Sequence, residues 1–196
     1  ILLGRRQKIL DIIEEHVLDL DGITIIDPKS ESEKSRRYLY GDKLYEKRQR
    51  KGITLYEARK LMRERNYFGA MMLELGETDA LISGITRNYP NTLRPALQII
   101  GTEKGVDKVA GMFIMNTKKG TLFLADTTIN IDPTAEDLAN IALITANTVK
   151  KFNITPRVAM LSYSNFGSSD TLAAKKVAKA REIVKASNNS LVVEGD

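Results

Sequence analysis

Short apolar runs alternate with amphipathic stretches along most of the chain, and this alternation limits the folds that the sequence can adopt. The pattern is clearest over residues 132–187, where a stretch of helical periodicity, the apolar run RVAMLSYS and a second helical stretch follow one another. Such alternation is typical of α/β proteins, in which helices pack on a largely parallel sheet. We therefore expect an α/β sandwich with a mostly parallel sheet and one antiparallel hairpin that turns at residues 118–120.

Periodicity and turn residues place the individual elements. Capping-box spacing marks two helix starts, at Thr54 with Glu57 and at Thr134 with Asp137. Helices are expected over residues 5–17, 32–52, 54–66, 67–76, 93–101, 132–153 and 170–187. Strands are expected over residues 1–4, 22–28, 79–84, 108–117, 120–130, 157–164 and 191–196.

Composition excludes several kinds of site. The 196 residues contain no cysteine and one histidine, His16, so disulfides and thiolate metal sites are excluded and a Ser-His triad is not expected. No apolar run approaches the roughly 20 residues of a membrane span, and no secretory signal is visible. We expect a cytoplasmic protein with no membrane partner and no bound metal in this chain.

The charge of the chain is positive and locally concentrated. The formal net charge is +5, the isoelectric point is about 9.3, and basic side chains gather between residues 34 and 65 among several acids. Nucleic-acid binding is one reading of such values, but aromatic residues make up only 6% of the chain and show no stacking pattern. We expect no nucleic-acid partner, and either a solvated basic helical pair or a basic wall beside a phosphate-bearing small molecule.

Three polar loops follow expected strands, at residues 83–92, 125–134 and 162–170. In open α/β sheets, ligands bind beyond the carboxyl ends of the strands, and backbone N–H groups with Ser or Thr hydroxyls suit phosphate. The same residue types also cap helices for purely structural reasons. The candidate ligand-binding residues of these loops are Ser83, Thr92, Ser162, Ser164, Asn165, Gly167 and Ser168.

Two further side chains draw attention by their positions. Arg94 precedes Pro95 at an expected helix start, where a cation opposes the helix dipole unless it meets an anion. A ligand role for Arg94 follows from that placement. Asp126 ends an expected strand and is suited to hold the adjacent loop by hydrogen bonds.

Several blocks of the sequence resemble the phosphate acetyltransferase (phosphotransacetylase) family, in the same order along the chain. They read RKGITLYEA, DALISG, NTLRPALQIIGTEKG, TLFLADTTINIDPTAEDLANIA and PRVAMLSYSNFGSS. The resemblance implies a three-layer α/β/α sandwich, as in isocitrate and isopropylmalate dehydrogenases. It also implies one phosphotransacetylase-like domain over residues 1–196, incomplete at both ends, with subdomain parts of about 1–105 and 106–196.

The same resemblance assigns site residues. Family arginines that bind phosphate and coenzyme A match Arg48 and Arg94. The family's remaining catalytic group, a Ser-Arg pair followed by an Asp, lies in a C-terminal segment that this chain does not reach. The resemblance further implies a homodimer or a higher homo-oligomer.

Two departures from the family pattern shape the expected function. The His-Ser-Ser or similar run that usually precedes TLRP is replaced by TRNYPN, and the usual SYSTxGS motif carries Asn165 and Phe166 instead. With SNFGSSD and GTLFLAD, these features resemble the domain fused to the C-terminus of large NADP-dependent malic enzymes.

We therefore expect an oligomerising domain that senses acetyl-CoA and is not itself catalytic. In its parent, malate would be decarboxylated to pyruvate with NADP and a divalent metal in an absent N-terminal part. The alternative is an active phosphate acetyltransferase that moves acetyl between coenzyme A and phosphate. Either function implies a small-molecule ligand: acetyl-CoA, coenzyme A, acetyl phosphate or phosphate.

Overall fold

A computed structural model describes residues 1–104, 106, 108–165 and 167–195 of the chain. The chain divides into two compact units, Ile1–Gly101 and Thr102–Asp196. Each unit has its own apolar core. In the part of the chain that is described, no helix is both long and apolar enough to cross a bilayer.

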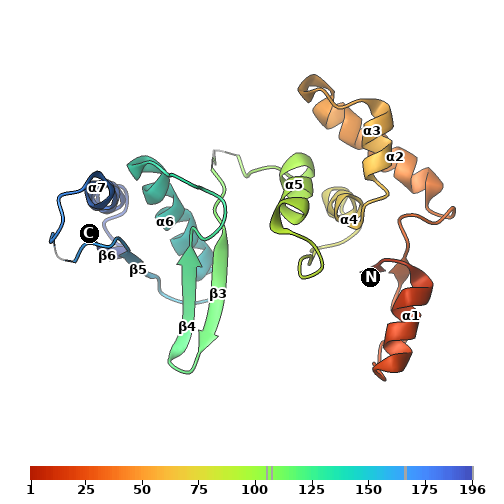
Figure 1. The fold of residues 1–196 in the computed structure, drawn as a ribbon, viewed down its shortest axis with the longest axis horizontal. Coiled ribbons are helices and arrows are strands. Elements are labelled where there is room, and N and C mark those ends of the chain that lie inside the picture. The colour runs from red at the N-terminus through yellow and green to blue at the C-terminus, as the bar shows by residue number, and fades with distance from the viewer. Residues whose placement is uncertain (105, 107, 166, 196) are drawn as a thin grey trace. The chain divides into compact units, whose positions relative to one another are not determined.

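The first unit is mainly helical, with one small parallel sheet (Figure 1). Strands β1 and β2 pair in parallel, with Leu2 opposite Ile25. The elements of this unit are β1 (Leu2–Leu3), α1 (Arg6–Glu15), β2 (Ile25–Ile26), α2 (Lys34–Arg48), the 3₁₀ turn η1 (Gln49–Lys51), α3 (Leu55–Leu61), α4 (Arg65–Glu74) and α5 (Tyr89–Ile99).

The core of the first unit forms where α2, α3 and α4 meet. Tyr40 and Leu44 lie one helical turn apart on α2 and are fully buried, and the Tyr40 ring lies 4.9 Å from the ring of Phe68 on α4. Helices α2 and α3 approach closely at Gly41, where a Cβ atom would meet the Cα of Arg59 at 2.6 Å. Any side chain at position 41 would therefore push the two helices apart.

Local signals account for the helix boundaries in this region. Gly52 ends the η1 turn in the left-handed conformation, with φ of 87°, and Thr54 then begins α3 with the expected capping box to Glu57. Between α3 and α4 the chain makes a tight turn, in which the N–H groups of Arg63 and Glu64 donate to carbonyls three residues earlier.

The strand expected at residues 79–84 does not form. In the part of the chain described, Ala80–Ser83 makes no backbone hydrogen bond, and β1 pairs only with β2. Leu81 of this segment and Leu3 of β1 both line a cavity of about 540 Å³. The expectation was wrong because an apolar run becomes a strand only when a neighbouring edge accepts its backbone groups.

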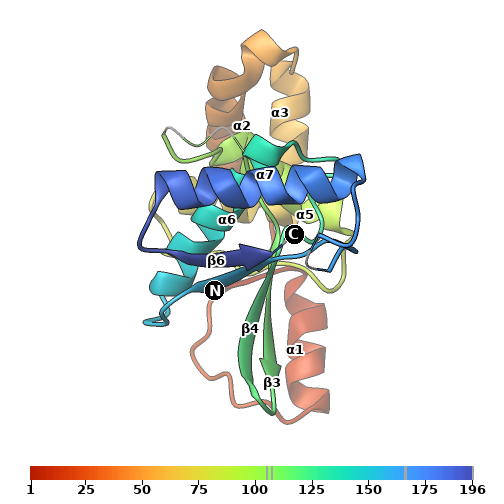
Figure 2. The same ribbon diagram turned by 90° about the vertical axis from the view of Figure 1, so that its left-hand side faces the viewer.

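The second unit consists of two strand pairs and one pair of packed helices. Strands β3 and β4 form the expected antiparallel hairpin, and β5 and β6 pair in parallel with Arg157 opposite Val192. Helix α7 lies along the β5–β6 pair and packs on α6 (Figure 2). The elements are β3 (Met112–Thr117), β4 (Gly120–Ala125), α6 (Ala135–Lys150), β5 (Arg157–Met160), α7 (Leu172–Ser187) and β6 (Val192–Gly195).

Small side chains let α6 and α7 approach each other. Ala139 and Ala146 on α6 and Ala180 on α7 are almost fully buried in one apolar cluster. Helix α6 begins with the expected capping box between Thr134 and Asp137. The α/β class, with mostly parallel pairing and one antiparallel hairpin, is thus confirmed. The three-layer arrangement and the kinship with isocitrate dehydrogenases stay predictions.

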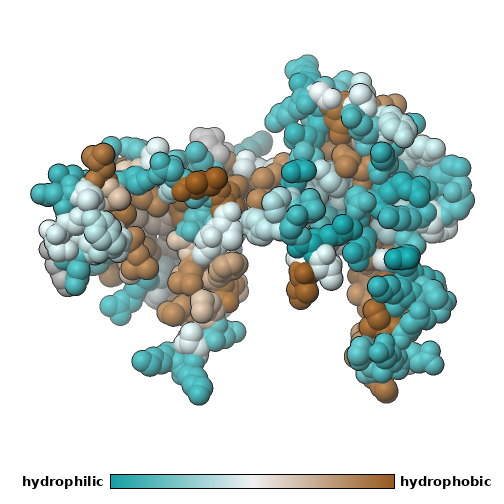
Figure 3. Space-filling model, viewed as in Figure 1, coloured by the Kyte–Doolittle hydropathy of each residue, from teal (hydrophilic) through white to brown (hydrophobic). Residues whose placement is uncertain are grey.

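The β3–β4 hairpin exposes apolar side chains. Phe113, Met115, Leu122 and Leu124 share one face by register and are 38–54% exposed. On the opposite face, Phe123 packs against Phe152 with ring centroids 5.6 Å apart. Figure 3 shows the apolar side chains gathered over this hairpin.

Asp126 organises the loop that follows β4, as the sequence suggested. Its Oδ1 accepts the N–H of Gly111 at 2.9 Å, and its Oδ2 accepts the N–H of Asn130 at 2.7 Å. Burial alone would raise the pKa of this carboxyl, but the N–H donors of Asn130, Gly111 and Thr128 outweigh burial and lower the pKa to about 2. The Asp126 carboxylate therefore has a structural role in holding this loop.

We expect Asp126→Asn to lower the free energy of unfolding by about 2 kcal/mol at neutral pH, because one charged acceptor of several N–H groups is lost. The folded pKa lies below the unfolded value, so this stabilisation is full above about pH 4 and disappears as the pH falls toward about 2. Urea unfolding at pH 7 and at several values between pH 2 and 4 measures both effects. Asp132→Asn is the control, since Asp132 is exposed. Equal stability losses in the two variants would contradict the assignment.

Candidate functional site

Two of the expected site residues lie near one buried tyrosine of the first unit. Arg48 is the last residue of α2, Arg94 lies on α5, and Tyr67 lies on α4. Burial raises the pKa of the Tyr67 phenol, and the positive charges of Arg94 and Arg48 act on it in the opposite direction. The structure therefore brings the two guanidinium groups into the electrostatic neighbourhood of the same side chain.

Neither arginine has a partner in the part of the chain that the structure describes. In the described residues, the guanidinium groups of Arg48 and Arg94 form no ion pair and no hydrogen bond. Several other cations of the same unit are paired instead. Side chains of the basic region with carboxylate or carbonyl partners are Lys34, Arg36, Arg37, Lys43, Lys47 and Arg59.

The paired cations differ from Arg48 and Arg94 in what they can still bind. Arg59 donates to Asp42 from two nitrogens, at 2.7 and 3.0 Å. A guanidinium group binds phosphate through the same paired donors, so Arg59 is already engaged. Arg48 and Arg94 keep that capacity free. Two unpaired guanidinium groups that act on the same phenol suit an anion with several oxygens, such as phosphate.

The reason first given for a ligand role of Arg94 needs correction. Helix α5 begins at Tyr89, with Asn88 as its cap, so Pro95 lies inside the helix and Arg94 lies in its second turn. The helix dipole acts mainly on the first turn, so it penalises a cation at position 94 little. Arg94 remains a candidate because its guanidinium has no partner in the described residues and because its charge, like that of Arg48, acts on the Tyr67 phenol.

The two other candidate residues of the first unit, Ser83 and Thr92, differ in whether their hydroxyl groups are free to bind a ligand. The Ser83 hydroxyl donates to Oδ1 of Asn66 at 2.7 Å, and the Asn66 amide in turn donates to the carbonyl of Asn91 at 3.0 Å. Ser83 is thus engaged in the fold. The Thr92 hydroxyl oxygen is buried and has no hydrogen-bond partner within the described residues.

The expected loop of the second unit, residues 162–168, is organised partly by its own side chains. The hydroxyl of Ser162 accepts the N–H of Ser164 at 2.9 Å, and the hydroxyl of Ser168 accepts the N–H of Asn165 at 3.0 Å. Gly167 has φ of 73°, a conformation that favours glycine. The Ser164 oxygen is buried without a partner in the described part. Phe166 lies outside the described residues.

Helix capping does not explain this loop. The cap of α7 is Thr171, whose hydroxyl accepts the N–H of Ala174 at 3.4 Å. Tyr163, which sequence reasoning missed, hydrogen-bonds to the hydroxyls of Ser169 and Thr171. Those two hydroxyls lower the pKa of the Tyr163 phenol. The loop therefore carries three hydroxyl groups in mutual contact beside the start of α7.

Sequence reasoning also missed Asn66, Tyr67 and Gln98. The Tyr67 hydroxyl donates to Oε1 of Gln98 at 2.7 Å and so links α4 to α5. One signal was available, because a proline inside a helix removes the N–H that would serve the carbonyl four residues earlier. That signal predicts a side-chain donor near Asn91, and Asn66 supplies it.

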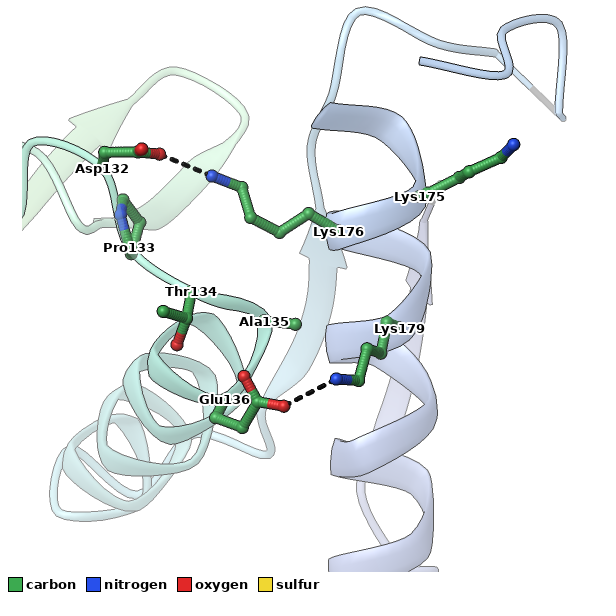
Figure 4. Close-up of a pocket in the computed structure, with 8 residues that line it drawn as sticks. All are labelled: Asp132, Pro133, Thr134, Ala135, Glu136, Lys175, Lys176 and Lys179. Carbon is green, nitrogen blue, oxygen red and sulfur yellow. Dashed lines mark hydrogen bonds and ion pairs between the residues drawn. The ribbon is translucent and has the colours of Figure 1, made fainter. Parts of the chain in front are cut away.

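A second cavity, of about 410 Å³, lies between the start of α6 and α7 (Figure 4). Lys176 reaches Asp132 at 2.7 Å and Lys179 reaches Glu136 at 2.7 Å, while Lys175 points away from both. The cations that face this cavity are neutralised, and none of the expected ligand-binding residues lines it. It suits an anion less well than the Arg48 and Arg94 pair. No group of three or more acidic or histidine side chains that could hold a metal occurs among the residues described.

Comparison with known proteins identifies the family. The model described as Phosphate acetyl/butaryl transferase matches residues 1–196. The chain belongs to this family.

Relatives of known function agree with that membership. The chain is 40% identical over 196 residues to a phosphate acetyltransferase of Synechocystis sp., covering 99% of this chain and 28% of the relative. It is 39% identical to a phosphate acetyltransferase of Bacillus subtilis, covering 100% of this chain and 59% of the relative. The chain thus spans little more than half of the length of the shorter of these two relatives.

Solved structures give the same result. The chain matches a phosphotransacetylase from Streptococcus pyogenes with a TM-score of 0.81 and 35% identity, covering 99% of this chain and 58% of the other. It matches EutD phosphotransacetylase from Staphylococcus aureus with a TM-score of 0.80 and 30% identity, covering 100% of this chain and 59% of the other.

The expected role as a regulatory domain of a malic enzyme is wrong. An NADP-dependent malic enzyme of Haemophilus influenzae does share this domain, at 36% identity over 197 residues and 26% of its own length. Phosphate acetyltransferases match as well or better over the whole chain, and the two structural neighbours are phosphotransacetylases. The expectation gave too much weight to a few loop positions. Asn165, for example, donates to Ser168 through its backbone N–H, which any residue except proline supplies.

We expect Arg48→Ala and Arg94→Ala each to weaken the binding of inorganic phosphate and of coenzyme A by about tenfold or more, because a charge-assisted pair of contacts is lost. The melting temperature should change little, since neither guanidinium has a protein partner in the described residues. Calorimetric titration and thermal unfolding on the same samples measure the two effects. Arg6→Ala, an exposed arginine of α1, is the control. Unaltered affinity in both variants would remove these arginines from the site.

Proposed function

We propose that the protein is an active phosphate acetyltransferase, which moves an acetyl group between coenzyme A and inorganic phosphate. The observation that carries the proposal is the pair of unpaired guanidinium groups, Arg48 and Arg94, near Tyr67. The relatives named phosphate acetyltransferase, at 34–40% identity, support it.

The proposed chemistry needs two bound anionic partners. A phosphate oxygen attacks the thioester carbonyl of acetyl-CoA, a C–O bond forms, and the C–S bond breaks. The electron pair of that bond leaves on the sulfur as the thiolate of coenzyme A, and acetyl phosphate is the other product. Arg48 and Arg94 would hold the phosphate oxygens and offset their charge, so that the nucleophile is fixed in place.

The polar loop at residues 162–168 supports a second contact region. The Ser164 hydroxyl, buried without a partner in the described part, is suited to a phosphate or amide group of coenzyme A. The Thr92 hydroxyl, buried without a partner in the described part, is a further donor for the ligand. A homodimer and a cytoplasmic location remain our predictions from the family resemblance.

The proposal predicts release of free thiol from acetyl-CoA that depends on phosphate, with acetyl phosphate formed in equal amount. Thiol is followed with a disulfide reagent, and acetyl phosphate is trapped by hydroxylamine as the hydroxamate. Arg94→Ala should raise the KM for phosphate by about tenfold or more. Thiol release without acetyl phosphate would show simple thioester hydrolysis and would contradict the proposal. Absence of both products would contradict it equally.

A further inference from the structure

Pro95 creates an unusual hydrogen-bond requirement in α5. It lies inside the helix, is fully buried and has no N–H group. In a regular helix the N–H of residue 95 would donate to the carbonyl of Asn91. That carbonyl therefore lacks its helical donor.

Asn66 meets this requirement from the neighbouring helix. Its side-chain amide nitrogen donates to the Asn91 carbonyl at 3.0 Å, and its Oδ1 accepts the Ser83 hydroxyl at 2.7 Å. The two contacts fix the orientation of the amide, because a carbonyl only accepts and therefore faces the nitrogen. One side chain thus joins α4, α5 and the loop at residue 83.

A second contact ties the same two helices further along. Tyr67 follows Asn66 on α4 and donates to Gln98 on α5. Asn91, Arg94 and Gln98 are spaced three and four residues apart, so they follow one another along one face of α5. Arg94 lies between the two tied positions.

We propose that Asn66 is a positioning residue for Arg94, acting through its hydrogen bond to the carbonyl that Pro95 leaves free. The inference rests on the proposed function, in which Arg94 holds phosphate. The Asn66 tie fixes the turn of α5 that carries Arg94, and so fixes the distance from this guanidinium to that of Arg48. A displacement of about 1 Å at such a site is enough to weaken a bidentate contact strongly.

The exposure of Asn91 makes it possible to distinguish a positioning role of Asn66 from a stabilising role. Asn91 is solvent-exposed, so water can replace the lost donor when the Asn66 amide is removed. We therefore expect Asn66→Ala to change the geometry of α5 more than the stability of the unit. Asn66→Gln keeps the same donor and acceptor groups and should retain part of the contact.

The test is a double-variant cycle on the affinity for inorganic phosphate, measured by calorimetry on the whole chain. Asn66→Ala should weaken binding by about fivefold to tenfold. In an Arg94→Ala background, the same substitution should change the affinity by less than about twofold, because Asn66 acts through Arg94. Asn66→Gln should recover part of the loss. Asn147→Ala, an exposed asparagine of α6, is the matched control and should bind as the wild type does.

Two results would overturn the proposal. Wild-type affinity in Asn66→Ala would show that the tie does not position Arg94. Equal weakening in the presence and absence of Arg94 would show that Asn66 acts on the ligand by another route.

Amide hydrogen exchange separates this proposal from the proposed function. Exchange at Arg94, Ala96 and Leu97 should become faster in Asn66→Ala and stay unchanged in Asn147→Ala. If the wild type binds no phosphate, the proposed function fails, and the exchange rates alone decide whether Asn66 positions this turn. Unchanged exchange would then overturn the inference about Asn66 as well.

Discussion

The burial of α4 is the constraint on which the first unit depends. Every residue from Tyr67 to Met72 is at most 9% exposed, so neighbouring elements must cover this helix on nearly all sides. Helices α2 and α5 supply part of that cover; α2 carries Arg48 and α5 carries Arg94. The candidate site therefore depends on core packing, since the helices that cover α4 bring both arginines within electrostatic range of Tyr67.

The net charge of the chain does not show which of its cations are free to bind an anion. In the basic region, carboxylates and backbone carbonyls engage about half of the cations, as in the pair of Arg59 with Asp42 and the contact of Arg37 with the Pro28 carbonyl. What matters for binding is which of the remaining cations lie together, and sequence counting does not identify them.

Local chemistry made much of the fold predictable. The capping boxes at Thr54 and Thr134, the hairpin turn before Gly120 and the loop held by Asp126 follow from residue types at fixed spacing, and all occur in the structure. The strand expected at residues 79–84 failed because strand formation depends on a partner that periodicity cannot supply. Arg48 and Arg94 came from family resemblance. Tyr67 and Asn66 were missed because their roles depend on which helix lies opposite, which a single sequence does not specify.

Gly41 shows how far a packing requirement can act. It lies seven residues before Arg48 on the same helix, so roughly 10 Å of helix axis separates the close approach of α2 and α3 from the guanidinium. A mutation that adds even one methyl group at position 41 must tilt α2, and the end of a rigid helix moves further than the point at which it is pushed. Under the proposed function, natural selection would then preserve a glycine that touches no substrate. A comparison of sequences that considered only ligand-contacting residues would not explain why Gly41 is preserved.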